Sequence, residues 1–365
     1  MPEPALRVPP SRISPVLDAS GRSLCEFSDD DGPHGALAEL ILDHNAFAAV
    51  PPVVAKLPVL RHLHLDHNRL AALPEWLACL TSLEALHARG NRLSRLPANI
   101  GDLASLRHLS VSKNGLTALP ASLWKLRLLE TLNLGENLLQ DLPVDIERLT
   151  RLQMLDLGHN RLTVIPPHIG ALHDLSILYL SDNSLEALPD SIENLRRLSY
   201  FAAADNRLSE VPASIGALAT LRELRLSRNR LVRLPDSIAG LQALRELHLG
   251  DNHLAVLPDA ICHLSSLEVL TLTNNRIGSL PASIGRLVRL TDLDLRNNCL
   301  TQLPPSLTLL PELRHLDLRG NSLHALPEGL SAMPQLVRLD LRWNKHLAAA
   351  AVLSELEARG CTVLV

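Results

Sequence analysis

The chain has 365 residues, of which 46% are hydrophobic and 20% are charged, and its formal net charge at pH 7 is −4. This slightly acidic balance comes with neither a basic stripe nor a base-stacking platform, so the composition argues against a nucleic-acid-binding protein. No run of apolar residues is long enough to span a membrane, and the first 20 residues lack the apolar centre of a secretory signal. We therefore expect neither a nucleic acid nor a membrane among the partners.

The N-terminal residues precede a regular array. Residues 1–13 contain Pro and Ser, are polar on balance and match no repeat, so we predict a disordered tail. Residues 14–36 form a degenerate copy of the unit that follows them, with apolar positions at Leu17, Ala19 and Leu24. We expect this copy to cap the hydrophobic core, because a terminal unit has a neighbour on one side only.

Residues 37–347 contain a unit of 23 residues that is repeated fourteen times. An asparagine marks each copy, and the spacing never slips: Asn45, Asn68, Asn91, Asn114, Asn137, Asn160, Asn183, Asn206, Asn229, Asn252, Asn275, Asn298, Asn321 and Asn344. A fixed period of this length is typical of a solenoid, in which each unit covers the apolar side chains of the one before it. We therefore interpret the chain as one domain.

Each unit has a local structure that follows from its residues. In the LxL segment the side chains alternate, so Leu63 and Leu65 point to one side of a short strand and His64 to the other. The asparagine turns the chain, and its amide is expected to bond backbone groups of its own and the adjacent coil. The proline that follows lacks the N–H of a continued strand, so the chain leaves the sheet there. The next stretch, xxSIGxL, is too short for a long helix and predicts an extended or single-turn helical return.

Residues 348–365 predict a C-terminal cap. The segment 348–359 is rich in good helix formers, and Gly360 stands where a helix is commonly terminated by glycine. Residues 362–365 are in register with residues 339–342 of the last copy. We expect a capping helix followed by an edge strand.

The repeat pattern LxxLxLxxNxLxxLPxxLxxL, seen over residues 60–80, resembles that of the leucine-rich repeat family. The half LPxSIGxL, seen from Leu280 to Leu287, is similar to the intracellular Ras-group repeats of plants, animals and some bacteria. The resemblance implies an α/β fold class: a leucine-rich repeat solenoid curved as a horseshoe, with a parallel sheet on the concave face and short helical or extended segments on the convex side.

The same resemblance implies a function. It implies a non-enzymatic scaffold for protein–protein interaction in intracellular signalling, monomeric and without a cofactor, that binds a small GTPase or a kinase on its concave face. No GxSxG elbow or phosphate-cradling Gly-rich loop argues for an enzyme. The five cysteines do not form the clustered caps of extracellular leucine-rich repeats, which favours the reducing cytoplasm. An alternative is a bacterial type III secreted effector that acts on a host protein, since such effectors carry a tail ahead of the array.

Partner contacts are expected at the variable strand positions, since leucine and asparagine are committed to the scaffold. The N-terminal copies place histidines there. His62, His64 and His87 are candidates for an adventitious metal site, and crowded imidazoles predict pH-sensitive partner binding. The string that contains His62, His64, Asp66 and His67 also matches HxHxDH, the metal motif of the metallo-β-lactamase family. A metal-dependent hydrolase is therefore a further alternative, although the surrounding leucines belong to the repeat, and a solvated polar face is the simplest interpretation.

The central copies place apolar and aromatic side chains on the same face. We predict a partner-binding anchor from these residues and the arginines of the next copy: Met154, Ile177, Tyr179, Tyr200, Arg225 and Arg228. The alternative is that Tyr200 merely repacks an irregular copy.

The C-terminal copies carry rows of opposite charge, with an aromatic residue at their end. The predicted partner-binding residues are Asp292, Asp294, Arg296, Asp317, Arg319, Asp340, Arg342 and Trp343. The charges are expected to steer a charged partner, or alternatively only to pair with each other.

Overall fold

A computed structural model describes residues 16–27, 36–348 and 350–365. The internal contacts divide the chain into two compact units, residues 1–175 and 176–365, and each is described by itself. The predicted disordered tail, residues 1–13, and the secretion signal expected in that tail lie outside the described residues. Within the described residues, no helix combines the length and the apolar character that crossing a bilayer requires.

Each of the two compact units, as distinct from the 23-residue repeats, is built on parallel strands of three residues that pair in sequence order. In the first unit the strands are β1 (Val16–Asp18), β2 (Glu39–Ile41), β3 (His62–His64), β4 (Ala85–His87), β5 (His108–Ser110), β6 (Thr131–Asn133) and β7 (Met154–Asp156). In the second unit they are β8 (Ile177–Tyr179), β9 (Tyr200–Ala202), β10 (Glu223–Arg225), β11 (Glu246–His248), β12 (Val269–Thr271), β13 (Asp292–Asp294), β14 (His315–Asp317), β15 (Arg338–Asp340) and β16 (Thr362–Leu364). The array therefore places residues one repeat apart side by side, as the solenoid predicts.

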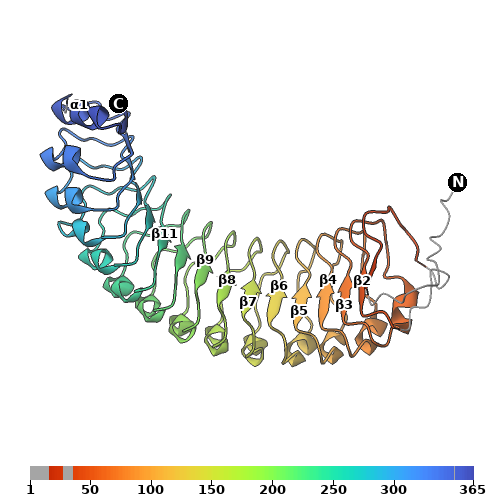
Figure 1. The fold of residues 1–365 in the computed structure, drawn as a ribbon. Helices are drawn as coiled ribbons and strands as arrows, with labels where there is room; N and C mark the ends of the chain where they lie inside the picture. The colour runs from red at the N-terminus through yellow and green to blue at the C-terminus, as the bar shows by residue number, and fades with distance from the viewer. Residues whose placement is uncertain (1–15, 28–35, 349) are drawn as a thin grey trace. The chain divides into compact units, whose positions relative to one another are not determined.

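The segments that return the chain to the next strand are short 3₁₀ helices. They are η2 (Pro52–Lys56), η3 (Glu75–Cys79), η4 (Ile100–Asp102), η5 (Ala121–Lys125), η6 (Val144–Arg148), η7 (Pro167–Ala171), η8 (Asp190–Asn194), η9 (Ala213–Ala217), η10 (Asp236–Gly240), η11 (Asp259–His263), η12 (Ile284–Arg286), η13 (Pro305–Leu309) and η14 (Glu328–Ala332). Figure 1 shows that within each unit these helices lie on the side opposite the strands. The prediction of a single-turn helical return is confirmed.

The hydrophobic core of each unit lies between its strands and its 3₁₀ helices. The middle residue of each strand points into it, so that Leu63 of β3 and Phe201 of β9 are both fully buried. The following LxL leucine, such as Leu65, is buried as well. The alternation predicted from the sequence is therefore present, and Phe201 fills a leucine position.

The asparagines form the predicted ladder. In each of the fourteen copies Nδ2 donates a hydrogen bond to the backbone carbonyl three residues earlier. Asn68 also reaches the preceding coil, because its Nδ2 donates to Leu42 O at 2.9 Å and its Oδ1 accepts from the backbone N–H of Phe47 at 3.1 Å. One side chain thus satisfies backbone groups of two coils.

The residue before each of these asparagines adopts a left-handed backbone, which the sequence analysis did not predict. The φ angles at these positions lie between 52° and 66°, yet glycine occupies only two of them, Gly90 and Gly320. Residues as large as Arg228 and Trp343 take the same conformation. Left-handed backbone is unfavourable for such residues, so the flanking strand pairing and the asparagine bonds must hold it in place.

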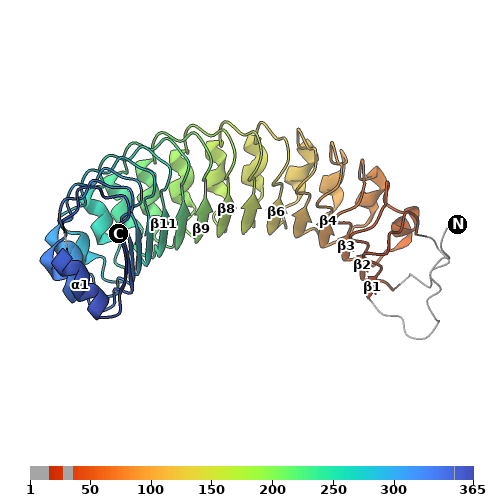
Figure 2. The same ribbon diagram turned by 90° about the horizontal axis from the view of Figure 1, so that it is seen from above.

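The two ends of the array differ in structure, and of the predicted N-terminal cap, residues 14–36, only residues 16–27 and 36 are described. Strand β1 pairs with β2, and the backbone N–H of Leu24 donates to Asn45 Oδ1 at 2.9 Å. At the other end helix α1 (Ala350–Ala358) is followed by β16, whose Val363 is the register partner of Leu339. Figure 2 shows α1 at the C-terminal end of the second unit. The predicted helix and edge strand are both present, and the helix begins at residue 350 rather than 348.

Candidate functional site

The polar side of the strands is the surface on which partner residues were expected, and we call it the strand face. It consists of the side chains of the first and third residue of each strand, such as His62 and His64 of β3. Most of these side chains are half-buried, whereas the leucine between them is fully buried. The repeat thus presents a row of variable side chains on a fixed backbone.

The histidines of the first unit form columns along the strand face. The rings of His64 and His87 are stacked, with centroids 4.8 Å apart and an interplanar angle of 2°. His64 Nε2 lies 3.2 Å from Glu39 Oε1, and His62 Nδ1 lies 4.0 Å from the other oxygen of that carboxylate. Burial lowers the pKa of His87, and the neighbouring His64 adds to this effect.

The structure does not bring the predicted metal ligands of this region together. Among the described residues, His62, His64 and His87 form no group whose ligand atoms all lie within 4.8 Å of one another. The physical reason is the stacking, which sets the rings of His64 and His87 face to face instead of turning their nitrogens toward one point.

Residues of the HxHxDH string likewise make contacts within the repeat array. Asp66 Oδ1 accepts a hydrogen bond from the backbone N–H of Arg89 at 2.6 Å, and the ring of His67 is stacked on His44 with centroids 4.5 Å apart. The residues of the hydrolase alternative therefore do not converge on a metal position within the part of the chain that the structure describes.

The two tyrosines of the chain meet on the strand face of the second unit. The ring centroids of Tyr179 on β8 and Tyr200 on β9 are 5.0 Å apart, with an interplanar angle of 48°. The guanidinium carbon of Arg225 lies 5.8 Å from the centre of the Tyr200 ring. Both tyrosines and Ile177 are half-buried, and burial raises the pKa of the Tyr200 hydroxyl. Phe201, the next residue, enters the core, whereas Tyr200 stays half-buried on the strand face.

Met154 and Arg228 are the other two members of the predicted anchor. Met154 is half-buried on β7 and belongs to the first unit. Arg228 lies in the turn after β10, where its Nη1 is 3.2 Å from Asp205 Oδ1, and its side chain is exposed. Within the second unit, the geometry thus groups Ile177, Tyr179, Tyr200 and Arg225 on the strand face.

The charged rows near the C-terminus pair with each other. Arg296 Nη2 lies 2.7 Å from Asp294 of its own copy, and its Nε lies 3.6 Å from Asp317 of the next copy. Arg319 repeats the arrangement, with Nη2 2.6 Å from Asp317. These residues border a hollow of about 640 Å³ on the strand face. The charges of these rows therefore pair with each other, and the steering of a charged partner stays a prediction.

Asp340 is the most enclosed carboxylate of these rows, with 1% of its side chain exposed. Arg342 Nη2 lies 2.7 Å away and Arg319 Nε 3.4 Å away. Burial alone would raise the pKa of Asp340, but the hydrogen bonds from Arg342 and the charge of Arg319 hold it below its ordinary value. Asp292, at the start of the rows, instead pairs with His315 Nδ1 at 2.6 Å.

Trp343 follows Arg342 at the end of the second unit. Its side chain is 67% exposed, and the guanidinium carbon of Arg342 lies 5.9 Å from its ring centre. Together with Leu353 and Val365 of the cap it borders a hollow of about 430 Å³. The position suits an interface residue, because most large aromatic side chains in soluble proteins are buried.

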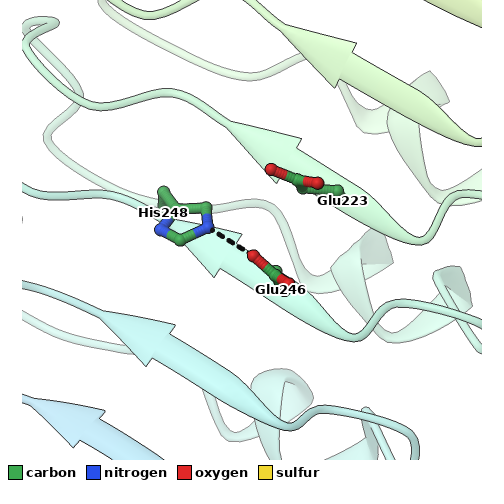
Figure 3. Close-up of side chains that lie close together, drawn as sticks. All are labelled: Glu223, Glu246 and His248. Atoms are coloured by element: carbon green, nitrogen blue, oxygen red, sulfur yellow. Dashed lines mark hydrogen bonds and ion pairs between the residues drawn. The ribbon is translucent and has the colours of Figure 1, made fainter.

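The structure also assembles a cluster that the sequence analysis missed. Glu223 of β10 and Glu246 and His248 of β11 are half-buried, and their ligand atoms all lie within 4.8 Å of one another. Figure 3 shows the three side chains side by side on these adjacent strands. The sequence contained a signal for this cluster: two glutamates 23 residues apart, with a histidine two residues after the second.

Comparison with known families gives two matching models. The model described as leucine rich repeat matches residues 36–93, 104–162, 265–323 and 288–345, and the model described as leucine-rich repeat region matches residues 144–247 and 190–277. No match was found among curated proteins.

Several solved structures are similar to this chain. A leucine-rich repeat protein of Leptospira interrogans is 30% identical, with a TM-score of 0.88 over 96% of this chain and 95% of that one. The ectodomain of the Arabidopsis thaliana receptor kinase GASSHO1/SCHENGEN3, solved in complex with CASPARIAN STRIP INTEGRITY FACTOR 2, is 30% identical with a TM-score of 0.66, covering 86% of this chain and 44% of that one. The plant peptide hormone receptor RGFR1 in complex with RGF2 is 27% identical with a TM-score of 0.69, covering 88% and 58%. This chain therefore spans less than two thirds of either plant receptor chain.

Proposed function

Because this chain belongs to the leucine-rich repeat family, we propose that it is a non-enzymatic binding module that holds a protein partner against its strand face. The observation that carries the proposal is the contact between Tyr179 and Tyr200 on the strand face of the second unit. Both tyrosine side chains are only half-buried, whereas the adjacent Phe201 is buried in the core. The tyrosines therefore leave aromatic surface on the strand face.

The tyrosine pair has the chemistry of an interface anchor. Tyr and Arg are enriched among the residues that dominate binding energy, because they bury a large area and still satisfy a polar end. Arg225 lies against Tyr200, and Ile177 adds an apolar side chain on the same strand as Tyr179. A partner that covers these four residues would remove aromatic and aliphatic surface from water.

The paired charges of the second unit give the partner surface its specificity. In Arg296, Arg319 and Arg342, each guanidinium is already paired with an aspartate, so these rows contribute steering and register more than affinity. Trp343 extends this surface to the end of the unit. We propose that the partner spans the tyrosine pair and at least part of the charged rows.

The relatives support a protein or peptide as the ligand. The two plant receptors are described in complex with CASPARIAN STRIP INTEGRITY FACTOR 2 and with RGF2. For this chain, the resemblance to Ras-group repeats favours a small GTPase or a signalling kinase, bound by a monomer. A cytoplasmic role agrees with the exposed free thiols of Cys25, Cys79 and Cys299, because exposed thiols persist in a reducing compartment.

Affinity capture with two matched baits tests this proposal. The first bait is the wild-type chain, the second carries Tyr179→Ala and Tyr200→Ala, and a control carries Val232→Ala and Val256→Ala at exposed positions outside the strands. A protein retained by the wild type and the control but lost from the tyrosine variant, and then bound directly after purification, supports the proposal. If every captured protein is retained equally by all three baits, the tyrosine pair is not the anchor.

A further inference from the structure

Glu223, Glu246 and His248 form a group of metal-ligand side chains in the second unit, separate from the tyrosine pair. Glu223 and Glu246 are register partners on adjacent strands, so their carboxylates emerge on the same face. His248 follows Glu246 by two residues and shares that face. Figure 3 shows the imidazole beside the Glu246 carboxylate, with Glu223 on the neighbouring strand.

We propose that these three residues bind a divalent transition metal ion, with Zn²⁺ as the best match. Two carboxylate oxygens and one imidazole nitrogen are a mixed O/N donor set that suits Zn²⁺ better than Mg²⁺ or Ca²⁺, which prefer oxygen alone. Their ligand atoms already lie within 4.8 Å of one another. Bonds of about 2.0–2.2 Å to each ligand require the glutamate side chains to close in by rotation about their torsions, and Glu223 has to release Arg225 to do so. Three protein ligands leave a coordination position for water.

His248 is held in the orientation that a ligand needs. Its Nε2 lies 3.1 Å from Glu246 Oε2, and its Nδ1 lies 3.0 Å from Thr271 Oγ1 on the next strand. Without metal, Nε2–H donates to Glu246 and the Thr271 hydroxyl donates to Nδ1. On metal binding the proton resides on Nδ1 and is donated to Thr271 Oγ1, so the lone pair of Nε2 faces the ion. An outer hydrogen bond of this kind fixes the ring of a metal-bound histidine.

The charges around the group favour a bound cation. Two glutamates directly opposite each other on neighbouring strands repel. Arg225 relieves part of this repulsion, because its Nε donates to Glu223 Oε1. A dication between the carboxylates would do the same for both glutamates, so the ion and Arg225 compete for Glu223. This competition predicts that the site strengthens when Arg225 is removed.

The first unit contains a natural comparison. His64 Nε2 lies 3.2 Å from Glu39 Oε1, much as His248 lies beside Glu246. Among the described residues, however, no group of three ligand atoms forms around that pair. His64 and its stacking neighbour His87 therefore serve as a matched control for ordinary histidine binding of zinc.

Zinc titration of the untagged full chain, followed by calorimetry and by metal analysis after gel filtration, tests the site. His64→Ala/His87→Ala is expected to keep the strongest-binding equivalent of zinc, and His248→Ala and Glu246→Gln are each expected to lose it. Thr271→Val keeps all three ligands and is expected to weaken binding by about 10–100-fold. Arg225→Ala is expected to bind more tightly than the wild type.

Two results of these zinc-binding measurements would contradict the proposed site. The proposal is overturned if His248→Ala and Glu246→Gln bind zinc with the stoichiometry and affinity of the wild type, which would show adventitious binding elsewhere. It is also overturned if Arg225→Ala weakens binding while its unfolding midpoint is unchanged. Glu246→Gln preserves side-chain shape, so it provides the loss-of-binding test even if His248→Ala disturbs folding.

Discussion

Asn252 Oδ1 accepts a hydrogen bond of 3.0 Å from the backbone N–H of Leu231, which lies in the preceding coil. Its Nδ2 donates to Leu226 O at 3.0 Å and to Leu249 O at 3.0 Å. The side chain is 4% exposed, so water does not replace these bonds when they are lost. At this copy the asparagine is therefore a buried polar link between its own coil and the preceding one.

Asn252→Ala is expected to lower the free energy of unfolding by about 1–3 kcal/mol, because it leaves buried backbone groups without partners. The measurement is urea unfolding followed by circular dichroism. Gln302→Ala, which truncates an exposed amide side chain of the same unit, is the control and is expected to change stability by less than about 0.5 kcal/mol. Equal midpoints for the two variants would contradict the ladder.

Phe201→Ala and Tyr200→Ala separate core packing from the strand face. Phe201 is fully buried, so its truncation is expected to cost about 3–5 kcal/mol of stability. Tyr200 is half-buried against Tyr179, so its truncation is expected to cost about 1 kcal/mol or less. Thermal unfolding of both variants measures the two losses of stability. A large loss of stability in Tyr200→Ala would place this tyrosine in the core and remove the basis of the anchor.

Gly240→Ala is expected to destabilise the second unit by about 1–3 kcal/mol through overpacking. A Cβ atom at Gly240 would lie 2.1 Å from the backbone oxygen of Gly216 in the previous 3₁₀ helix, and backbone has little freedom to move away. Gly278→Ala is the matched control, because a Cβ atom there meets nothing within 4 Å. If both alanine variants unfold at the same urea concentration, the coils do not pack as closely as described.

His87 predicts a pH dependence of stability. Burial, together with the charge of the stacked His64, lowers the pKa of His87 in the folded state. Below the unfolded-state pKa of about 6.5 the unfolded chain binds more protons at this position, so stability falls as the pH drops from there toward the folded pKa. His87→Asn is expected to show a shallower fall between pH 7.5 and 5.5 than the wild type in urea unfolding, whereas His263→Asn, at an exposed histidine, is expected to keep the wild-type slope. An unchanged slope in His87→Asn would contradict this.

Much of the fold was predictable because, in a regular repeat, the sequence period shows which residues are neighbours in space. A residue and its counterpart 23 positions later occupy adjacent strands, as Leu40 and Leu63 do. The buried leucines, the ladder and the meeting of Tyr179 with Tyr200 all follow from that period. The left-handed residue before each asparagine did not follow from it, because glycine, the usual signal of that backbone, stands at only two of these positions, Gly90 and Gly320.

The sequence by itself determined which side chains share the strand face and which strands neighbour each other, since the period and the alternation of strand residues decide both. Only the tertiary structure decided how those side chains turn. His64 and His87 stack and do not converge, whereas Glu223, Glu246 and His248 do converge. Backbone register brings side chains to within reach of each other. Rotamers, ion pairs such as that of Arg225 with Glu223, and hydrogen bonds such as that of His248 with Thr271 then select among the possible contacts. These choices depend on the packing of several coils at once, so the sequence period alone does not determine them.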